Sequence, residues 1–386
     1  MDSAVNESDQ SPIMDTFGIC AHLYTIPIAD DEAAENWLHT PISEIIYMIL
    51  LPIVVVLGIA GNGAFLFMVA RLSRMKTAVN FLLVNLAITD LIFLSTQSLF
   101  LMYVFFLTPV SYRYPFKTTG SCVIIYLIGY LSYYCSISII TLVSIERFYA
   151  ICRPFKHRKM QSKGHMLKAT AAAYLISAIL AVATLMKRMK IHEVCLKWPD
   201  TERYENVPMV FRYCGPLRGI SGIVVTMEIT YSVVFFFAAI INSFLYAKIV
   251  VALGSRSIAA NNDKENQQIS VRNQVAKALV INGILFFVTQ LPMRVNDINE
   301  ILEALEEPQF LSKQQMANSL SFSALFLFMN SALNPYVYAF SSSNYRQGFK
   351  DAFSRSFNVI AKNSKQVLKP TVSQVSAVTN VETSKI

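Results

Sequence analysis

The chain has 386 residues, of which 54% are hydrophobic and 15% are charged, and its mean hydropathy is +0.44. Soluble domains carry about 25% charged residues, so the composition excludes a disordered chain, a nucleic-acid-binding arm and a typical cytosolic enzyme. The apolar residues lie in long blocks, which favours a protein that crosses a membrane several times. The formal net charge of +8 comes from basic loops, so we expect a lipid surface and no nucleic acid beside it.

In chain order, seven blocks contain almost no Asp, Glu, Lys or Arg, and only Asp90 and Glu228 interrupt them. About 20 residues of helix cross the hydrocarbon core of a bilayer. Five blocks meet that length, the fourth is marginal, and the sixth is short unless Arg294 and the next turn also lie in the bundle. The blocks are residues 45–70, 77–112, 118–145, 169–186, 219–247, 278–293 and 314–345. We therefore predict an all-α membrane protein with a seven-transmembrane bundle over residues 41–340.

The charge between the blocks predicts the orientation. Residues 1–40 contain eight acidic residues and no Lys or Arg, whereas the loops after the first and third blocks and the tail after the seventh are basic. Basic loops stay in the cytoplasm. We therefore expect residues 1–40 to form an extracellular tail, in which the sequon at Asn6 is a candidate glycosylation site.

The six cysteines divide by side of the membrane. Four fall outside, where disulfides persist, and they allow three pairings between which the cysteine spacing does not choose. The other two fall in or under the membrane and are expected to be free, small buried hydrophobes. The outer four are Cys20, Cys122, Cys195 and Cys214, and the inner two are Cys135 and Cys152.

Polar side chains lie at comparable depths in four of the blocks. Charged groups inside a bilayer are costly and by default mark function. A ring of oxygens would hold Asp90 ionised with a small cation or let it share a proton. Equally, Ser and Asn stitch membrane helices together, so residue spacing leaves both interpretations open. The residues concerned are Asn62, Asp90, Ser132, Ser136, Asn330, Ser331 and Asn334.

Five short motifs, in order and each on the expected block, resemble those of rhodopsin-like (class A) G-protein-coupled receptors. Cys122 lies twenty-five residues before Arg147, as the third-helix cysteine of that family does. The similarity covers roughly residues 40–355. The motifs are Gly61-Asn62, the run Asn-Leu-Ala-Ile-Thr-Asp at residues 85–90, Glu146-Arg147-Phe148, Pro154-Phe155, and Asn334-Pro335-Tyr336-Val337-Tyr338.

The resemblance implies a ligand-switched receptor of the plasma membrane that couples to heterotrimeric G proteins and is not an enzyme. The Arg147 guanidinium would leave Glu146 and bind the G protein, or Tyr246 and Tyr338, when the receptor switches. The alternative is that Arg147 only extends its charge to the membrane–water interface. Phe155 would enter a pocket of the G protein. The resemblance also implies an allosteric Na⁺ held by Asp90 and Ser136 in a pocket completed by Ser132, Asn330 and Asn334.

Several positions depart from the family pattern. Helix six of the family usually carries a Trp, and this chain has Gln290 there. Helix four usually carries a Trp, and this chain has Tyr174. Helix five usually carries a Pro, and this chain has Ala238. Ile137 and Phe286 retain the other two members of a packing switch. Pro292 should still kink helix six. Arg272 replaces an acidic residue that locks Arg147 in some members, which predicts appreciable basal activity.

The resemblance also bears on the ligand. Phe328 replaces the lysine of opsins and Gly129 replaces the aspartate of amine receptors. What remains is an aromatic, hydrogen-bonding pocket with one cation, suited to amides or a carboxylate. Arg294 is that cation, unless it pairs with Asp297 or Glu228 as a structural bridge. The expected ligand-binding residues are Gln97, Tyr130, Tyr133, Tyr134, Arg294 and Asn296.

A peptide ligand follows from the long loop at residues 188–218, which peptide receptors fold into a hairpin. The expected disulfides are Cys122–Cys214 and Cys20–Cys195. Residues 272–277, 284–286 and 292–294 are similar to helix six of receptors for thyrotropin-releasing hormone, ghrelin and neuromedin. An acidic rim would steer a basic peptide. That rim comprises Asp297, Glu300, Glu303, Glu306 and Glu307.

After the seventh block, residues 341–356 have the pattern of a short amphipathic helix on the inner leaflet. Residues 357–386 read as a disordered tail that binds arrestin when phosphorylated. The alternatives are a class A receptor for a small molecule or lipid, and a transporter. A transporter should show internal repeats, and the sequence contains none that we detect.

Overall fold

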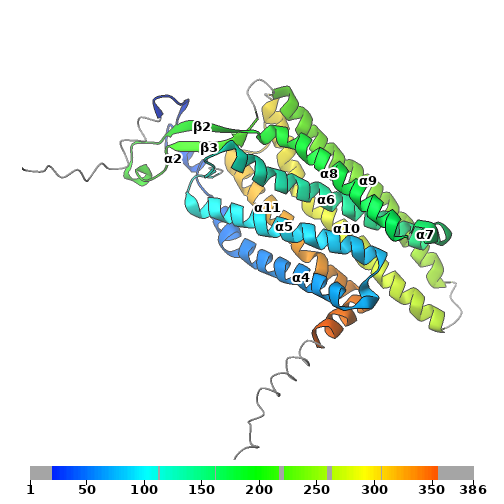
Figure 1. The fold of residues 1–386 in the computed structure, drawn as a ribbon. Helices are drawn as coiled ribbons and strands as arrows, with labels where there is room; N and C mark the ends of the chain where they lie inside the picture. The colour runs from blue at the N-terminus through cyan, green and yellow to red at the C-terminus, as the bar shows by residue number, and fades with distance from the viewer. Residues whose placement is uncertain are drawn as a thin grey trace, which may run out of the picture.

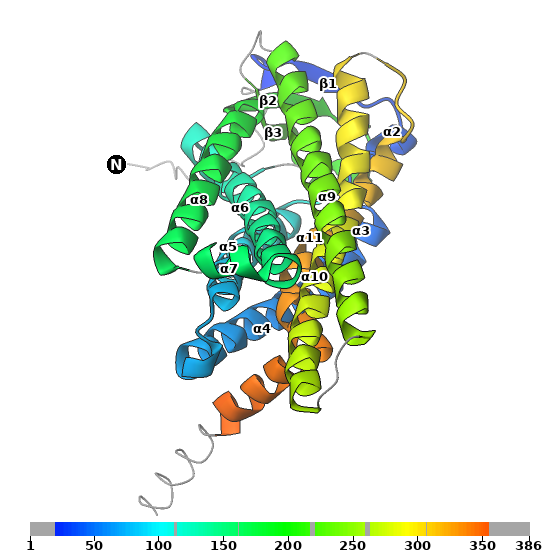
Figure 2. The ribbon, with the colours of Figure 1, turned by 90° about the vertical axis from the view of Figure 1, so that its right-hand side faces the viewer.

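The computed structural model describes residues 20–111, 114–160, 162–216, 221–258, 263–305 and 307–354. Within them, seven helices are long and apolar enough to cross a membrane, as predicted. They lie side by side in an elongated bundle (Figures 1 and 2). The helical segments of the bundle are α3 (Pro41–Ile45) with η1 (Ile46–Leu50) and α4 (Leu51–Arg71), α5 (Ala78–Leu107), α6 (Thr119–Cys152), α8 (Lys163–Leu185), α9 (Ser221–Ile258), α10 (Asp263–Ala304) and α11 (Lys313–Ser341).

Side-chain caps fix where the spanning helices begin. Thr77, Thr118 and Ser162 each accept a hydrogen bond from the backbone N–H three residues on, which satisfies a donor that the first helical turn leaves free. Ser312 does the same for α11, and the side chain of Gln315 accepts in return from the Ser312 N–H. The sixth helix runs well past Met293, so Arg294 and the next turns do lie in the bundle.

Close helix packing at Gly58 and the hydrogen bonds of the motif residue Asn62 join the first spanning helix to its neighbours. At Gly58, an added Cβ would lie 2.7 Å from Leu94 and 2.9 Å from Ala332, so α4, α5 and α11 meet there only because the side chain is absent. One turn on, the Asn62 amide donates to the Gly58 and Ser331 carbonyl oxygens at 3.0 and 2.9 Å. Asn62 therefore stitches the first and seventh spanning helices together, in keeping with the interpretation as helix–helix glue.

A three-stranded sheet covers one end of the bundle (Figure 1). Strands β2 (Lys190–Lys197) and β3 (Val210–Gly215) form the expected hairpin, and β1 (Thr25–Pro27) pairs with β2 in parallel. Both expected disulfides are present: Cys122–Cys214 joins the hairpin to α6, and Cys20–Cys195 joins it to the N-terminal segment. Cys135 and Cys152 are free thiols. The cover is thus attached covalently to the bundle.

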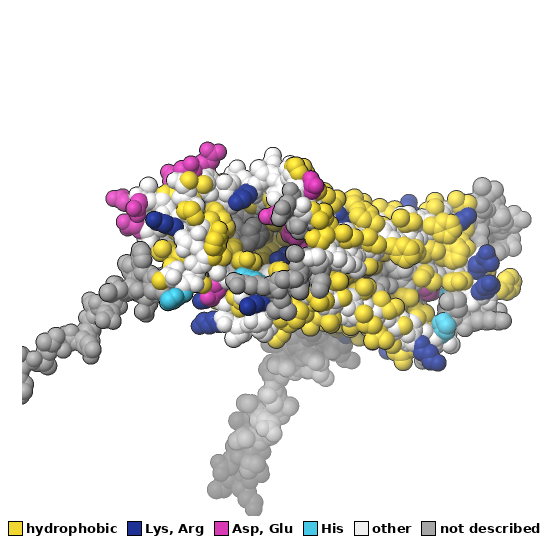
Figure 3. Space-filling model, turned by 90° about the horizontal axis from the view of Figure 1, so that it is seen from above, with side chains coloured by type: hydrophobic (Ala, Val, Ile, Leu, Met, Phe, Trp, Pro, Cys, Tyr) yellow, Lys and Arg dark blue, Asp and Glu magenta, His cyan; other side chains and the backbone are white. Residues whose placement is uncertain are grey.

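The side surface of the bundle is apolar. Figure 3 shows hydrophobic side chains along its flank, with acidic side chains gathered toward the end that carries the sheet. Residues such as Leu99, Phe237 and Ile240 are about two-thirds exposed, which a soluble protein would not tolerate over so many positions. The flank therefore fits a lipid environment.

Residues 343–354 form the short helix expected after the seventh span. Tyr345 and Ala352 are buried against the bundle, whereas Arg346 and Lys350 are exposed, so the apolar face is the one predicted. The Tyr345 hydroxyl donates to Asn80 Oδ1 at 2.7 Å. Asn6, Glu306 and the tail from residue 355 lie outside the residues that the structure describes. The side chain of Arg272 is also outside the described part.

His39 ties the segment before α3 to the loop after α5. Its Nε2 lies 3.0 Å from the Thr108 carbonyl oxygen, which only accepts, and its Nδ1 lies 3.2 Å from Ser111 Oγ. Burial lowers the pKa of His39 below its ordinary value of 6.5, against a smaller opposing effect of the Thr108 carbonyl. Because the unfolded chain takes up the proton first, stability is complete above the ordinary value and declines as the pH falls through it toward the lowered one.

We therefore expect the melting temperature of the detergent-solubilised protein to fall between about pH 7.5 and about pH 5.5. The substitution His39→Gln, which keeps a donor toward Thr108, should remove part of that fall. His22→Gln is the control because His22 is exposed. Equal pH profiles for the wild type and His39→Gln would contradict this account.

Candidate functional site

A cavity of about 280 Å³ lies inside the bundle below the sheet. Its lining reaches from Arg188, close to the hairpin, to Asp90 and Ser136 deep in α5 and α6. Ser136 is 17 residues from the first residue of α6, or about 25 Å along the helix. One continuous space therefore joins the expected ligand pocket to the expected sodium pocket.

Three of the six expected ligand-binding residues line this cavity, namely Gln97, Tyr130 and Tyr133. The other three do not. The Tyr134 hydroxyl lies 2.8 Å from Thr184 Oγ1 on α8, and the Asn296 amide donates to Ser323 Oγ on α11 at 2.8 Å. Helical spacing placed these residues near the pocket, but their side chains turn toward neighbouring helices.

Arg294 is not the free cation of the pocket. Its guanidinium lies 4.1 Å from the ring centroid of Tyr231, and its Nη1 lies 2.8 Å from Asp297 Oδ2. Both charged side chains are almost fully buried. Arg294 is therefore the structural bridge named above as its alternative role, and Asp297, which was expected on an acidic rim, is buried inside.

The cations that do face the cavity are Lys187 and Arg188, which the ligand assignment missed. They lie on a short 3₁₀ turn, η3 (Met186–Arg188), that ends the fourth span and turns its last residues inward. Lys187 Nζ lies 2.5 Å from Glu228 Oε1, and Arg188 lies 3.9 Å from Glu300. Two basic residues at the outer end of a span, where basic residues are uncommon, were the signal in the sequence.

Asp90 lies at the deep end of the cavity and is buried. Its Oδ2 accepts a hydrogen bond from the Asn334 amide at 2.6 Å. Around the same space lie Ser132, Ser136, Asn330 and Ser331. The donor set is one carboxylate with hydroxyl and amide oxygens, which is the ligand type that a hard cation prefers.

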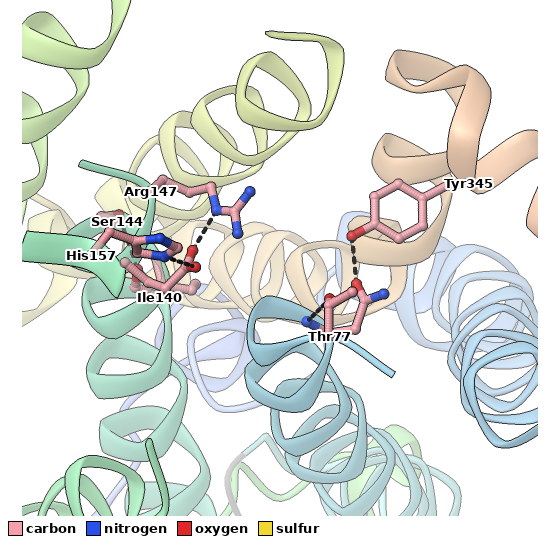
Figure 4. A network of polar contacts seen from close by, with 8 residues as sticks. Thr77, Ile140, Ser144, Arg147, His157 and Tyr345 are labelled. Atoms are coloured by element: carbon pink, nitrogen blue, oxygen red, sulfur yellow. Dashed lines mark hydrogen bonds and ion pairs between the residues drawn. The ribbon is translucent and has the colours of Figure 1, made fainter. Parts of the chain in front are cut away.

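The end of α6 away from the sheet carries a compact polar network (Figure 4). Arg147 Nε donates to Glu146 Oε2 at 2.5 Å, and Nε2 of His157, on α7 (Pro154–Met160), lies 3.0 Å from the other carboxylate oxygen. Glu146 thus bridges the arginine and the adjoining loop helix. Phe155, on the same loop helix, is 87% exposed.

The two tyrosines expected to receive Arg147 have other partners in this structure. The Tyr246 hydroxyl accepts from Ser144 Oγ at 2.9 Å, and the Tyr338 hydroxyl accepts from the Asn282 amide at 3.4 Å. Tyr246 fills the space left by Gly283, where an added Cβ would overlap its hydroxyl. Arg147 is therefore held by Glu146 alone among these groups, as expected of an unswitched bundle.

The core at the positions of the usual trigger is apolar. Ile137, Ala238 and Phe286 are all buried in one apolar cluster between α6, α9 and α10. Pro292 and Pro335 lie inside α10 and α11. Tyr174, in the position of the missing helix-four Trp, donates to Asn85 Oδ1 at 2.9 Å.

With this geometry in place, comparison with known proteins decides the family. A family model described as "7 transmembrane receptor (rhodopsin family)" matches residues 61–338. The chain belongs to this family. It is accordingly a receptor-type membrane protein and not an enzyme, and the predicted fold class is confirmed.

Curated relatives in the family are peptide receptors by name. Apelin receptor B of Danio rerio is 31% identical over 146 residues, which are 38% of this chain and 39% of that protein. Tachykinin-like peptides receptor 99D of Drosophila melanogaster is 24% identical over 327 residues, 80% of this chain and 57% of that protein. Type-1 angiotensin II receptor B of Xenopus laevis is 24% identical over 297 residues, 76% and 75% respectively. The chain thus matches about two-fifths of the first relative and rather more than half of the second.

The buried bridge leads to a prediction about Arg294. Substitution Arg294→Gln leaves the Asp297 charge buried without its partner, and breaking such a pair costs about 3–5 kcal/mol. We expect a lower melting temperature and a lower surface level. The double substitution Arg294→Gln, Asp297→Asn removes both charges and should recover most of the loss. A stable, normally expressed Arg294→Gln protein that no longer responds to ligand would instead make Arg294 a ligand contact.

Proposed function

We propose that this protein is a cell-surface receptor that binds an extracellular peptide and signals through heterotrimeric G proteins. The observation that carries the proposal is that α6 connects two sites. It lines the cavity under the sheet with Tyr130 and Tyr133, and it ends on the Glu146–Arg147 pair at the opposite end. A ligand that packs differently against two arrangements of the bundle changes which arrangement is populated.

The end with the sheet is proposed to be extracellular. Both disulfides lie there, and disulfides persist in oxidising compartments. The basic loops lie at the other end, as cytoplasmic loops do. The N-terminal segment, including the candidate glycosylation site Asn6, would then face outward, and the chain would cross the plasma membrane seven times.

A peptide ligand is supported by the relatives and by the cover over the cavity. One relative is named as a receptor for tachykinin-like peptides and another as an angiotensin II receptor. The lining of the cavity reaches Tyr114 and Arg188, and Arg188 Nη1 donates to the Cys214 carbonyl oxygen of the hairpin at 3.1 Å. Hydroxyl, amide and charged side chains in its lining suit the backbone and termini of a short peptide.

Switching is proposed to release Arg147 from Glu146. Glu146 is held by Arg147 and by His157 at once, so outward motion of α10 need only present Arg147 with competing partners such as Tyr246. Phe155, exposed beside this network, would then enter a pocket of the G protein. The phosphorylated tail is proposed to bind arrestin, and residues 343–354 to lie against lipid of the inner leaflet.

We test the proposal by nucleotide exchange on a panel of heterotrimeric G proteins, using membranes that contain the full chain and a library of short peptides. At least one peptide should raise exchange, and Arg147→Ala should abolish the rise while peptide binding persists. Arg71→Ala, at the cytoplasmic end of α4, is the control and should respond as the wild type does. Exchange no greater than in empty membranes for every G protein would reject the function.

We also propose that Asp90 and Ser136, with Ser132, Asn330 and Asn334, hold Na⁺ and that the ion favours the unswitched bundle. The donor set around Asp90 fits a hard cation. Sodium chloride should then stabilise the purified protein relative to choline chloride, by about 1.4 kcal/mol at about ten times the dissociation constant. Asp90→Asn should lose that difference, whereas Ser98→Ala, two turns along the same helix, should keep it. Equal stabilisation of Asp90→Asn would exclude this site.

A further inference from the structure

The outer part of the cavity is rich in charge, yet its charges are already matched. Each of three cations has a carboxylate partner on a neighbouring segment or on the next helical turn. A ligand ion would have to break one of these pairs or enter unpaired. Both are costly at the two buried pairs, Lys187–Glu228 and Arg294–Asp297, and less so at Arg188–Glu300, whose side chains are about 30% exposed. The pairs are Lys187–Glu228 at 2.5 Å, Arg188–Glu300 at 3.9 Å and Arg294–Asp297 at 2.8 Å.

Around the cavity, several buried polar atoms have no hydrogen-bond partner among the described residues. Some belong to charged residues that have an ion-pair partner, namely Arg188, Glu228 and Asp297, and two are neutral. Gln290 Oε1 and the Tyr133 hydroxyl are buried, and neither has a hydrogen-bond partner among the residues that the structure describes. Both side chains line the cavity, and they are 5% and 8% exposed. A buried polar atom without a partner is unfavourable. A ligand that hydrogen-bonds to these two atoms removes that cost and therefore gains binding free energy.

A second carboxamide faces the same space. The Gln97 amide nitrogen donates to the Ile125 carbonyl oxygen at 2.9 Å, which leaves its oxygen turned toward Gly129. A Cβ built at Gly129 would lie 3.3 Å from that oxygen. The absence of a side chain at Gly129 therefore keeps the Gln97 oxygen available beside the cavity.

Asp90 is the remaining carboxylate in the lining. It accepts from the Asn334 amide and lies in the same part of the cavity as Ser132 and Ser136, deep in the bundle. A cationic group of a ligand would therefore be attracted to Asp90 and not to the neutral Gln290. A positively charged probe thus reports on Asp90, and a neutral probe reports on Gln290.

We propose that the cavity selects an uncharged carboxamide group of its ligand, and that Gln290 is the specificity-determining contact. A primary or secondary amide carries both a donor and an acceptor, so it can satisfy the Gln290 oxygen and the Tyr133 hydroxyl together. A blocked peptide terminus or an Asn or Gln side chain supplies such a group. This inference rests on the proposed function, whose ligand it narrows to a class.

The position of Gln290 also gives this contact a route to the rest of the molecule. Gln290 lies two residues before Pro292, where α10 lacks a backbone hydrogen bond. A group bound to Gln290 therefore acts directly on the helix that must move. A tryptophan at this position would fill the space that the ligand amide would enter.

The test uses the purified full chain and three small probes that share the phenylalanine side chain and differ at their two ends. N-acetyl-phenylalanine amide is neutral, N-acetyl-phenylalanine has a carboxylate in place of the terminal amide, and phenylalanine amide has an ammonium in place of the acetylated nitrogen. Binding is measured by the shift in melting temperature with probe concentration. The neutral probe should bind about tenfold more tightly than either charged probe, because each charged probe brings an ion for which the outer part of the cavity has no free ion-pair partner.

Two variants and one control complete the test. Gln290→Leu should weaken the neutral probe about tenfold, and Gln290→Glu should shift the preference to the cationic probe. Thr96→Val, whose hydroxyl bonds only the Ile92 carbonyl oxygen of its own helix, should bind the probes as the wild type does. Tyr133→Phe should weaken the neutral probe, but, unlike Gln290→Glu, it should not make the cationic probe the tightest binder.

Equal binding of the three probes, tightest binding of a charged probe, no binding of the neutral probe, or neutral-probe affinity unchanged in Gln290→Leu would each overturn the inference. None of these outcomes depends on a G protein. Failure here therefore leaves the proposed receptor function standing, and failure of nucleotide exchange leaves the preference for a neutral amide standing.

Discussion

The fold depends on the cost of placing charge where there is no water. In a low-dielectric bundle an unpaired ion is strongly disfavoured, so each buried charge must find a partner on whichever segment packs against it. Lys187 meets Glu228 across the fourth and fifth spans, and Glu146, which pairs with Arg147 on α6, also contacts His157 on α7. The Lys187–Glu228 and Glu146–His157 contacts help to fix the mutual positions of helices whose apolar surfaces alone would allow sliding.

The same constraint links structure to switching. An ion pair at an interface has two satisfactory states only if another partner is available, and Arg147 has candidates in Tyr246 and Tyr338, both now engaged elsewhere. Asp90 likewise has hydrogen-bonding neighbours and room for a cation. In the proposed function, these are the two places where a charge has alternative partners, and apolar packing lies between them.

The disulfide-bound sheet adds a second constraint. The disulfide Cys122–Cys214 fastens the hairpin to α6, Cys20–Cys195 fastens it to the N-terminal segment, and β1 pairs with β2. The sheet is therefore held in place over the cavity. A ligand therefore meets a prearranged mouth, which reduces the ordering that binding requires. The end that carries the sheet is thus held by two disulfides, and the Glu146–Arg147 pair lies at the opposite end.

The sequence by itself determined the seven spans, the inner polar residues, the hairpin and, through its motifs, the family, because hydropathy, spacing and motif order are local properties. It did not determine which of the pocket residues face the cavity. Arg294 reads as a free cation until the rings of Tyr133 and Tyr231 and the carboxylate of Asp297 are seen around it. Lys187 reads as a loop residue until the 3₁₀ turn carries it inward. Only tertiary structure decided these points, since the direction of a side chain and the partner of a charge depend on the rotation of each helix against its neighbours, and no single segment encodes that rotation.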